Sequence, residues 1–191
     1  MKLLNKHTLF AMLMVVFVLL TLGTSTSRAV PNQVERIYLP LVNNSFIKGF
    51  TNPGFEYGTQ GWVIQSNQGD SVVTTAAAHN GVRSAALGNG SSNRLASIAQ
   101  QVKVPQQAYV VSYYQWVESL DSCSGTVVVS INDQPYQHYN ICQDSNNAKW
   151  VEMNIYLAPY KGQTVEFRLE YQSSTTLNNY LYVDDFSFEV P

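Results

Sequence analysis

The residues that could carry out catalysis in this sequence are few and scattered. Histidine is the commonest general base, and after Ala29 the chain has only His79 and His138. His79 precedes Asn80-Gly81, a turn dipeptide, and His138 stands in a polar, tyrosine-containing run, so we expect turn or surface roles for both. The sequence contains no Gly-x-Ser-x-Gly or His-Glu-x-x-His motif. These observations predict that the protein is not an enzyme.

Cys123 and Cys142 are the two cysteines of the chain. In an exported protein, two isolated thiols most simply form one disulfide, and closing this loop would contribute roughly 3 kcal/mol. A metal-bound pair or two free thiols are the alternatives, but the sequence lacks the His-rich partners that a zinc site needs. We therefore predict a Cys123–Cys142 disulfide.

Aromatic and charged side chains form a candidate binding surface. In residues 109–118, the period of two turns Tyr114, Trp116 and Glu118 outward if Val111, Tyr113 and Val117 face the core. Sugars offer C–H faces that stack on rings and hydroxyl groups that need directed polar partners. We therefore predict that Tyr114, Trp116, Glu118 and Arg168 bind a carbohydrate on one sheet face. A bulge near Gln115 would instead turn Trp116 into the core.

Three further tyrosines are candidates for the rim of this surface. They are Tyr136, Tyr139 and Tyr180.

The N-terminal segment, residues 1–29, predicts a secretory signal peptide. Lys2 and Lys6 precede the uncharged run Leu9–Leu22, and Ser27-Arg28-Ala29 has small residues at the two positions that signal peptidase reads. An uncleaved membrane anchor is the alternative, although a span needs about 20 apolar residues. We therefore predict that residues 1–29 are removed, which leaves a secreted, extracellular protein without a membrane span.

The charge balance argues against nucleic acid and anionic membranes as partners. The chain has 11 Lys and Arg against 13 Asp and Glu, and the leader takes with it three basic residues and no acidic one. A processed protein of this composition has an acidic surface, which repels polyanions.

The rest of the chain predicts one all-β domain. Residues 30–48 contain Pro40 within a short apolar run, which indicates a tether or an extra edge strand. Residues 49–191 show turn residues at regular intervals and no long stretch of helical period. Alternating segments span 97–104, 109–118, 126–132, 150–157, 164–172 and 180–190. This spacing predicts a two-sheet antiparallel sandwich.

Several motifs in order resemble a known family. They are Asn52-Pro53-Gly54-Phe55-Glu56-Tyr57-Gly58, Gly61-Trp62, Asn80-Gly81-Val82-Arg83, Gln100-Gln101-Val102-Lys103-Val104-Pro105, Trp150 to Leu157 and Tyr182-Val183-Asp184-Asp185-Phe186. Their order resembles the galactose-binding-like jelly-roll superfamily, especially carbohydrate-binding modules of the family 4, 9 and 22 type. The resemblance implies a jelly-roll β-sandwich and places Trp62 and Trp150 in its core.

The resemblance also implies a structural calcium between the first and last strands. Its ligands would be the main-chain oxygen of Gly54 and the carboxylates of Glu56 and Asp184, which suits the oxygen preference of calcium. The alternation places Asp184 on the core face with Phe186 and Phe188, where a carboxylate needs a cation or hydrogen bonds. Glu56 and Asp184 could instead accept main-chain N–H groups or pair with Arg83. Either role gives the Asp184-Asp185 pair a structural rather than a catalytic explanation.

The leading hypothesis for function is a non-catalytic extracellular module that binds a polysaccharide or cell-surface glycan. The alternative is a structural or adhesion module without a sugar site, because this fold supports many roles.

Overall fold

The computed structural model describes residues 49–119, 124–142, 148–173 and 179–191. The predicted leader (1–29) and tether (30–48) lie outside these residues. The described chain forms ten strands and one short 3-10 helix, Ala158–Tyr160. The strands are β1 (Val63–Ser66), β2 (Val73–Thr74), β3 (Ser84–Asn89), β4 (Leu95–Lys103), β5 (Val110–Ser119), β6 (Gly125–Ile131), β7 (Gln134–Asn140), β8 (Trp150–Tyr156), β9 (Thr164–Ser173) and β10 (Asn179–Glu189).

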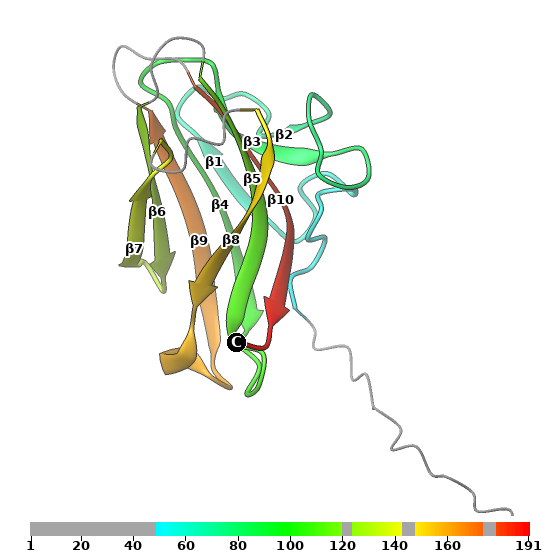
Figure 1. Cartoon of the computed structure of the whole chain (residues 1–191), viewed down its shortest axis with the longest axis vertical. Coiled ribbons are helices and arrows are strands. Elements are labelled where there is room, and N and C mark those ends of the chain that lie inside the picture. Colours follow the sequence, from blue (N-terminus) through cyan, green and yellow to red (C-terminus); the bar gives the residue numbers. More distant parts are fainter. Residues whose placement is uncertain (1–48, 120–123, 143–147, 174–178) are drawn as a thin grey trace, which may run out of the picture. The chain divides into compact units, whose positions relative to one another are not determined.

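The strands form two antiparallel sheets that pack face to face (Figure 1). Sheet A has the order β1-β4-β9-β6-β7, and sheet B has the order β2-β3-β10-β5-β8. Neighbours within a sheet are often far apart in sequence, as β10 between β3 and β5 is. The predicted all-β, two-sheet antiparallel jelly-roll sandwich is confirmed.

The alternation of β9 and β6 builds the core side of sheet A. Val165, Phe167, Leu169 and Tyr171 of β9 are at most 1% exposed, and Val127, Val129 and Ile131 of β6 are equally buried. These are the inward sets that a period of two predicts. Burial of such side chains is worth about 25 cal/mol per Å² of apolar surface, which makes this face a large source of stability.

Strand β7 is an element that the sequence pattern did not predict. Its sequence, QPYQHYN, contains Pro135 and lacks apolar alternation, and six of its seven residues are exposed. It forms an edge of sheet A, which is where a strand tolerates proline. His138 lies on this strand and is exposed, as expected.

A β-bulge in β10 overturns the predicted face of Asp184. Pairing between β10 and β5 is regular up to Asp184 and resumes at Ser187. Between these positions, Asp185 and Phe186 stand opposite a single residue of β5, and Asp185 has a φ of 52°. The extra residue reverses the alternation. Asp184 therefore does not share the core-facing side of Phe186 and Phe188, as predicted, but points to the outer side of sheet B.

Arg94 connects the two sheets at the start of β4. Its side chain is fully buried and donates to the main-chain oxygens of Leu87 (2.5 Å) and Ala86 (3.1 Å) on β3. Its Nη1 also lies 2.8 Å from Asp70 Oδ1. Because β4 belongs to sheet A and β3 to sheet B, this side chain joins the two layers through charge-assisted hydrogen bonds.

Candidate functional site

The outer side of sheet B carries a row of rings that we call the aromatic face: Tyr114, Trp116, Trp150, Tyr180 and Tyr182. On β5, Trp116 stands opposite Trp150 of β8 and Tyr182 of β10, so three strands contribute to one surface. Tyr114 and Trp116 are half-buried, which confirms the predicted outward phase of β5. The expectation that Trp150 packs in the core is wrong, because its pairing with Trp116 turns it outward as well.

The rings of the aromatic face contact one another closely. The Trp116 and Trp150 centroids lie 5.6 Å apart at an interplanar angle of 81°, and the Tyr180 and Tyr182 rings are parallel with centroids 6.1 Å apart. Glu118 stands opposite Tyr180. Burial raises the pKa of Tyr182, with smaller contributions from Tyr180 and from the negative charge of Glu118.

His79 covers one of the predicted binding residues. Its ring stacks on Tyr114 with centroids 3.6 Å apart and an interplanar angle of 10°, and its Nδ1 lies 2.7 Å from Asp185 Oδ2. One face of the Tyr114 ring is therefore already occupied. The role of His79 is to hold the loop before β3 against the sheet, which the sequence did not indicate beyond its turn position.

Arg168 does not belong to this surface. It lies on β9, in sheet A, whereas Tyr114, Trp116 and Glu118 lie on β5, in sheet B. The prediction of one shared face is wrong, because alternation gives the phase of each strand but not the sheet to which the strand belongs. Arg168 Nη2 instead lies 2.6 Å from Glu166 Oε1 on the outer side of sheet A.

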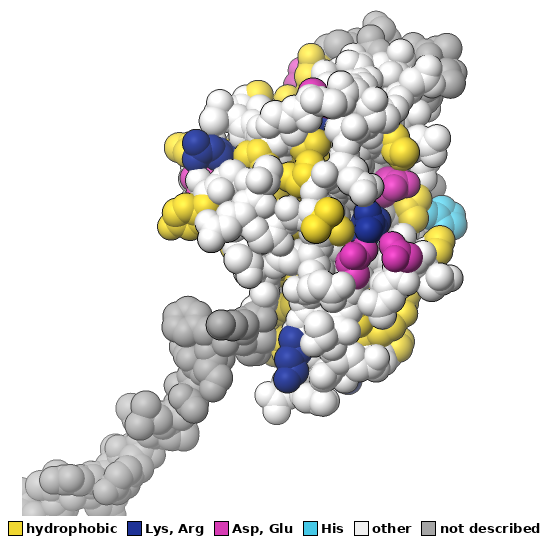
Figure 2. Space-filling view, turned by 180° about the vertical axis from the view of Figure 1, so that it is seen from behind, with side chains coloured by type: hydrophobic (Ala, Val, Ile, Leu, Met, Phe, Trp, Pro, Cys, Tyr) yellow, Lys and Arg dark blue, Asp and Glu magenta, His cyan; other side chains and the backbone are white. Residues whose placement is uncertain are grey.

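The outer side of sheet A is charged and hollowed. Figure 2 shows this side of the molecule, where one basic side chain is surrounded by acidic ones. Arg168 contacts Glu166 and, at 3.5 Å, Asp133, while its Nε is buried without a partner among the described residues. Outward positions of β1, β4, β9 and β6 hold no Phe, Trp or Tyr ring in the part of the chain that the structure describes. Polar and aliphatic side chains therefore dominate this face.

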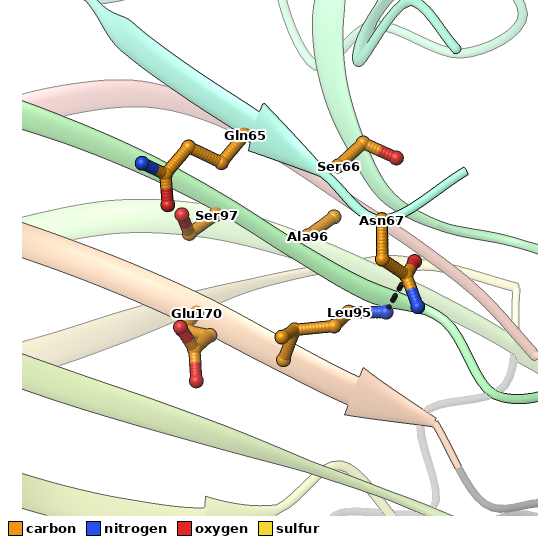
Figure 3. A pocket seen from close by; sticks show the side chains of 7 residues that line it. All are labelled: Gln65, Ser66, Asn67, Leu95, Ala96, Ser97 and Glu170. Carbon is orange, nitrogen blue, oxygen red and sulfur yellow. Dashed lines mark hydrogen bonds between the residues drawn. The ribbon is translucent and has the colours of Figure 1, made fainter. Parts of the chain in front are cut away.

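A hollow of about 220 Å³ opens on the outer side of sheet A (Figure 3). Its lining comes from three adjacent strands and the turn after β1: Gln65, Ser66, Asn67, Leu95, Ala96, Ser97 and Glu170. Ser97 is 2% exposed and Leu95 is 40% exposed. The Leu95 N–H donates to Asn67 Oδ1 at 3.0 Å, which fixes one wall. No hydrogen bond or ion pair to the Glu170 carboxylate is found among the described residues.

Sequence reasoning missed this hollow. Glu170 was recognisable as an outward residue of its strand, but nothing in the sequence distinguished it from Glu166. The hollow depends on the pairing of β1 with β4, which places Gln65 opposite Ser97, and of β4 with β9, which places Ser97 opposite Glu170.

The three predicted calcium ligands lie around the loop before β3. Glu56 Oε1 accepts the N–H groups of Val82 and Arg83, both at 2.9 Å, and these bonds lower the pKa of Glu56. Glycine at position 54 keeps space open beside the aspartates, since a Cβ there would lie 3.1 Å from Asp185 Oδ1 and 3.5 Å from Asp184 Oδ1.

Asp184 is fully buried and accepts main-chain hydrogen bonds. Its Oδ2 accepts the N–H groups of His79 (2.8 Å) and Asn80 (3.4 Å), and its Oδ1 accepts the N–H of Asp185 (2.9 Å). Burial is the largest influence on this carboxyl group and, with the nearby charge of Asp185, raises its pKa to about 6. The described residues hold no group of three or more His, Cys, Asp or Glu side chains arranged for a metal. The donor set consists instead of two carboxylates and the main chain, which suits calcium rather than a transition metal.

The remaining sequence predictions have separate outcomes. Trp62 packs in the core, 6% exposed and stacked on Phe55. Of the rim candidates, Tyr180 lies on the aromatic face, Tyr139 hydrogen-bonds the buried Tyr113, and Tyr136 lies on β7 in the other sheet. Cys142 is not a free thiol, and Cys123 lies outside the described residues, so their pairing stays a prediction.

Comparison with known proteins links this geometry to a family. Residues 48–183 match the family model described as a carbohydrate binding domain. A solved structure with a similar fold is TmCBM61 in complex with β-1,4-galactotriose, with a TM-score of 0.55 and 16% identity over 75% of this chain and 99% of that one. No curated protein matches the chain.

Two other solved structures share the fold. The K3 cleaved adhesin domain of Lys-gingipain from Porphyromonas gingivalis has a TM-score of 0.54 and 14% identity, over 72% of this chain and 97% of that one. CBM28, a module specific for non-crystalline cellulose, has a TM-score of 0.50 and 15% identity, over 73% and 93% of the respective chains. At such identities these likenesses describe the architecture alone.

Proposed function

The chain belongs to the carbohydrate binding domain family, and from this premise we propose that residues 49–191 are a non-catalytic, extracellular module that binds a polysaccharide or cell-surface glycan in the hollow of sheet A. Export by the leader (1–29) is part of this proposal. No helix among the described residues has the length and apolar character needed to cross a membrane.

The observation that carries the proposal is the hollow itself. It is a concave site of about 220 Å³ on a face built by paired strands, so its lining is held in place by the sheet. Glu170 offers a carboxylate without a partner among the described residues, and the exposed Gln65 offers a side-chain amide. A sugar presents hydroxyl groups to such acceptors and donors, and binding sites usually contain a few polar groups of this kind.

An apolar side chain complements these polar groups. Leu95, in the lining of the hollow, is 40% exposed, while Val63, outside the lining on the outer side of β1, is 58% exposed. Aliphatic side chains can cover the C–H face of a pyranose ring, although they lack the stacking attraction of an aromatic ring. Arg168 lies on the same side of β9 as Glu170, two positions earlier in the strand, and we include it in the site as a donor to ligand oxygens.

Affinity electrophoresis in gels containing β-1,4-galactan or amorphous cellulose, followed by a glycan array, tests the proposal. We expect Glu170→Gln to lower affinity at least tenfold, since it removes a charged acceptor while keeping the shape of the side chain. Glu189→Gln is the control, because it makes the same change of charge at an exposed position of β10, in the other sheet and outside the lining of the hollow.

Unchanged binding by Glu170→Gln would overturn the assignment of the site. If the wild-type protein bound nothing on a broad array, the structural or adhesion role would replace carbohydrate binding.

We also propose that Gly54, Glu56 and Asp184 hold a structural calcium. The support is a fully buried carboxylate, Asp184, with no Lys or Arg ion pair among the described residues. A buried charge is costly without compensation, and calcium would neutralise Asp184 and Glu56 together. The observed N–H bonds leave lone pairs on each carboxylate, so they are compatible with a cation. Bound calcium would tie the chain before β1 to β10 and to the loop before β3.

A further inference from the structure

We propose that the aromatic face is a second carbohydrate-binding surface, on the opposite side of the domain from the hollow, which holds a sugar ring by stacking. This inference rests on the proposed function for the class of ligand, but it concerns different residues and a different sheet. It makes the domain bivalent.

Backbone pairing concentrates the rings on one side of sheet B. Trp116 lies between Trp150 and Tyr182, and Tyr180 follows on the same side of β10. The Trp150 and Trp116 rings meet in a T-shaped contact rather than stacking in parallel. Both tryptophans are only partly buried and so remain accessible to a ligand. Leaving part of each indole in water forgoes apolar burial, which a ligand that covers the rings would recover.

The hydrogen bonding of Trp116 indicates that packing alone does not explain this residue. Its indole N–H is buried and has no acceptor among the described residues. A phenylalanine at this position would supply a ring to the sheet without leaving a donor unpaired. What tryptophan adds over phenylalanine is a larger π-surface, and a ligand that stacks on the ring would contact this surface.

The polar residues between the rings favour a sugar over a protein partner. Along the outer side of β8, Glu152 and Asn154 lie between Trp150 and Tyr156, and on β5 Glu118 follows Trp116. A protein interface has a contiguous apolar centre depleted of charge. A pyranose instead needs a ring for its C–H face and nearby oxygen acceptors for its hydroxyl groups, which is the composition of this surface.

The two faces belong to different sheets of the sandwich, so their outer sides face away from each other (Figure 1). A chain bound in the hollow cannot reach the aromatic face of the same domain without passing around its edge. Two polysaccharide chains are the simplest ligands for such an arrangement, and one domain would then link them.

The test uses the chain without residues 1–29, with β-1,4-galactan and amorphous cellulose as probes. Affinity and the sedimentation of cross-linked soluble polysaccharide are compared among the wild type, Trp150→Ala, Trp116→Phe and Glu170→Gln. We expect the wild type to cross-link. Trp150→Ala should retain binding through the hollow but lose cross-linking, and Glu170→Gln should retain binding through the aromatic face and lose cross-linking as well.

Tryptophan fluorescence gives a second readout. Oligosaccharide should shift the emission of the Glu170→Gln protein, since Trp116 and Trp150 lie at the remaining site, whereas Trp62 is in the core. Thermal melting shows whether Trp150→Ala is folded. If it is not, Trp116→Phe, which keeps a ring in place, should weaken the aromatic face several-fold without loss of folding.

Different results overturn the two proposals separately. If Glu170→Gln abolishes all binding and the fluorescence response, the aromatic face is not a site. The aromatic face is likewise not a site if the folded Trp150→Ala or Trp116→Phe protein cross-links polysaccharide as well as the wild type does. If Glu170→Gln has no effect and the tryptophan variants abolish binding, the hollow is wrong and the aromatic face is the only site.

Discussion

The outer side of sheet A presents a hollow lined by Gln65, Ser97 and Glu170, whereas the outer side of sheet B presents the rings of Trp116 and Trp150. Both surfaces arise from strands that bury every second residue in the same core. They differ because the outward positions are free of the packing constraint, so each sheet can carry its own chemistry. A small sandwich can therefore present polar groups on one side and aromatic rings on the other.

The largest expected effect comes from breaking the link between the two sheets. Arg94→Ala would remove the bonds to the main-chain oxygens of Ala86 and Leu87 and leave Asp70 without its ion-pair partner. Breaking a buried charged network typically costs about 3–5 kcal/mol. We expect a loss of this size in denaturant unfolding, together with weaker binding at both faces.

Lys103→Ala is the control for this prediction, since Lys103 is exposed at the other end of β4. Ordinary surface substitutions change the free energy of unfolding by no more than about 0.5 kcal/mol. A change as small as this for Arg94→Ala would show that the sheets do not depend on this connection.

Removal of the proposed calcium should affect the two faces unequally. A ligand that binds only the native state adds about 2.7 kcal/mol at a hundredfold excess over its Kd, so a chelator should lower the melting temperature. Asp184 stands opposite Tyr114, and the loop that covers Tyr114 also contacts Asp184. We therefore expect chelation to weaken binding at the aromatic face more than binding in the hollow.

Asp184→Asn is the variant that tests the calcium site, because it should make the melting temperature insensitive to chelator. Identical melting of metal-free and calcium-loaded wild type would contradict the site.

The smallest expected effect is an acid-dependent loss of stability at the sheet connection. Burial opposes ionisation of Asp70, but hydrogen bonds from Arg94 and Ser66 outweigh it and lower its pKa from 3.8 to about 2. Because the folded pKa is below the unfolded one, this contribution is complete above about pH 4 and is lost as the pH falls towards 2. Unfolding measured between pH 5 and pH 2 should show a steeper decline for wild type than for Asp70→Asn, and parallel curves would exclude this contribution.

The strands of the core were predictable from the sequence because their side chains obey a simple rule. The alternation of Val165 to Tyr171 and of Val127 to Ile131 predicted both the strands and their buried sides. The same rule correctly turned Trp116 outward. It failed at Asp184, because a bulge inserts one residue without any local signal strong enough to reveal it, and at β7, whose exposed sequence lacks an apolar pattern.

The candidate sites were predictable only in part. Tyr114, Trp116 and Glu118 lie on one face as expected, because they belong to a single strand. Arg168 was wrongly joined to them, and Trp150 was wrongly placed in the core. The hollow around Glu170 was not predicted at all, since it requires the register of three strands that are distant in the sequence.

By itself, the sequence determined that this chain is all-β, that it carries the ordered motifs of a carbohydrate-binding jelly roll, and which residues of each core strand point inward. Those properties depend on local periodicity and on motif order. Only the tertiary structure decided which strands share a sheet, and therefore which outward residues meet. Sheet membership is set by hydrogen bonds between strands such as β10 and β5, which are separated in the chain by four other strands, and no periodicity within one strand encodes its neighbours.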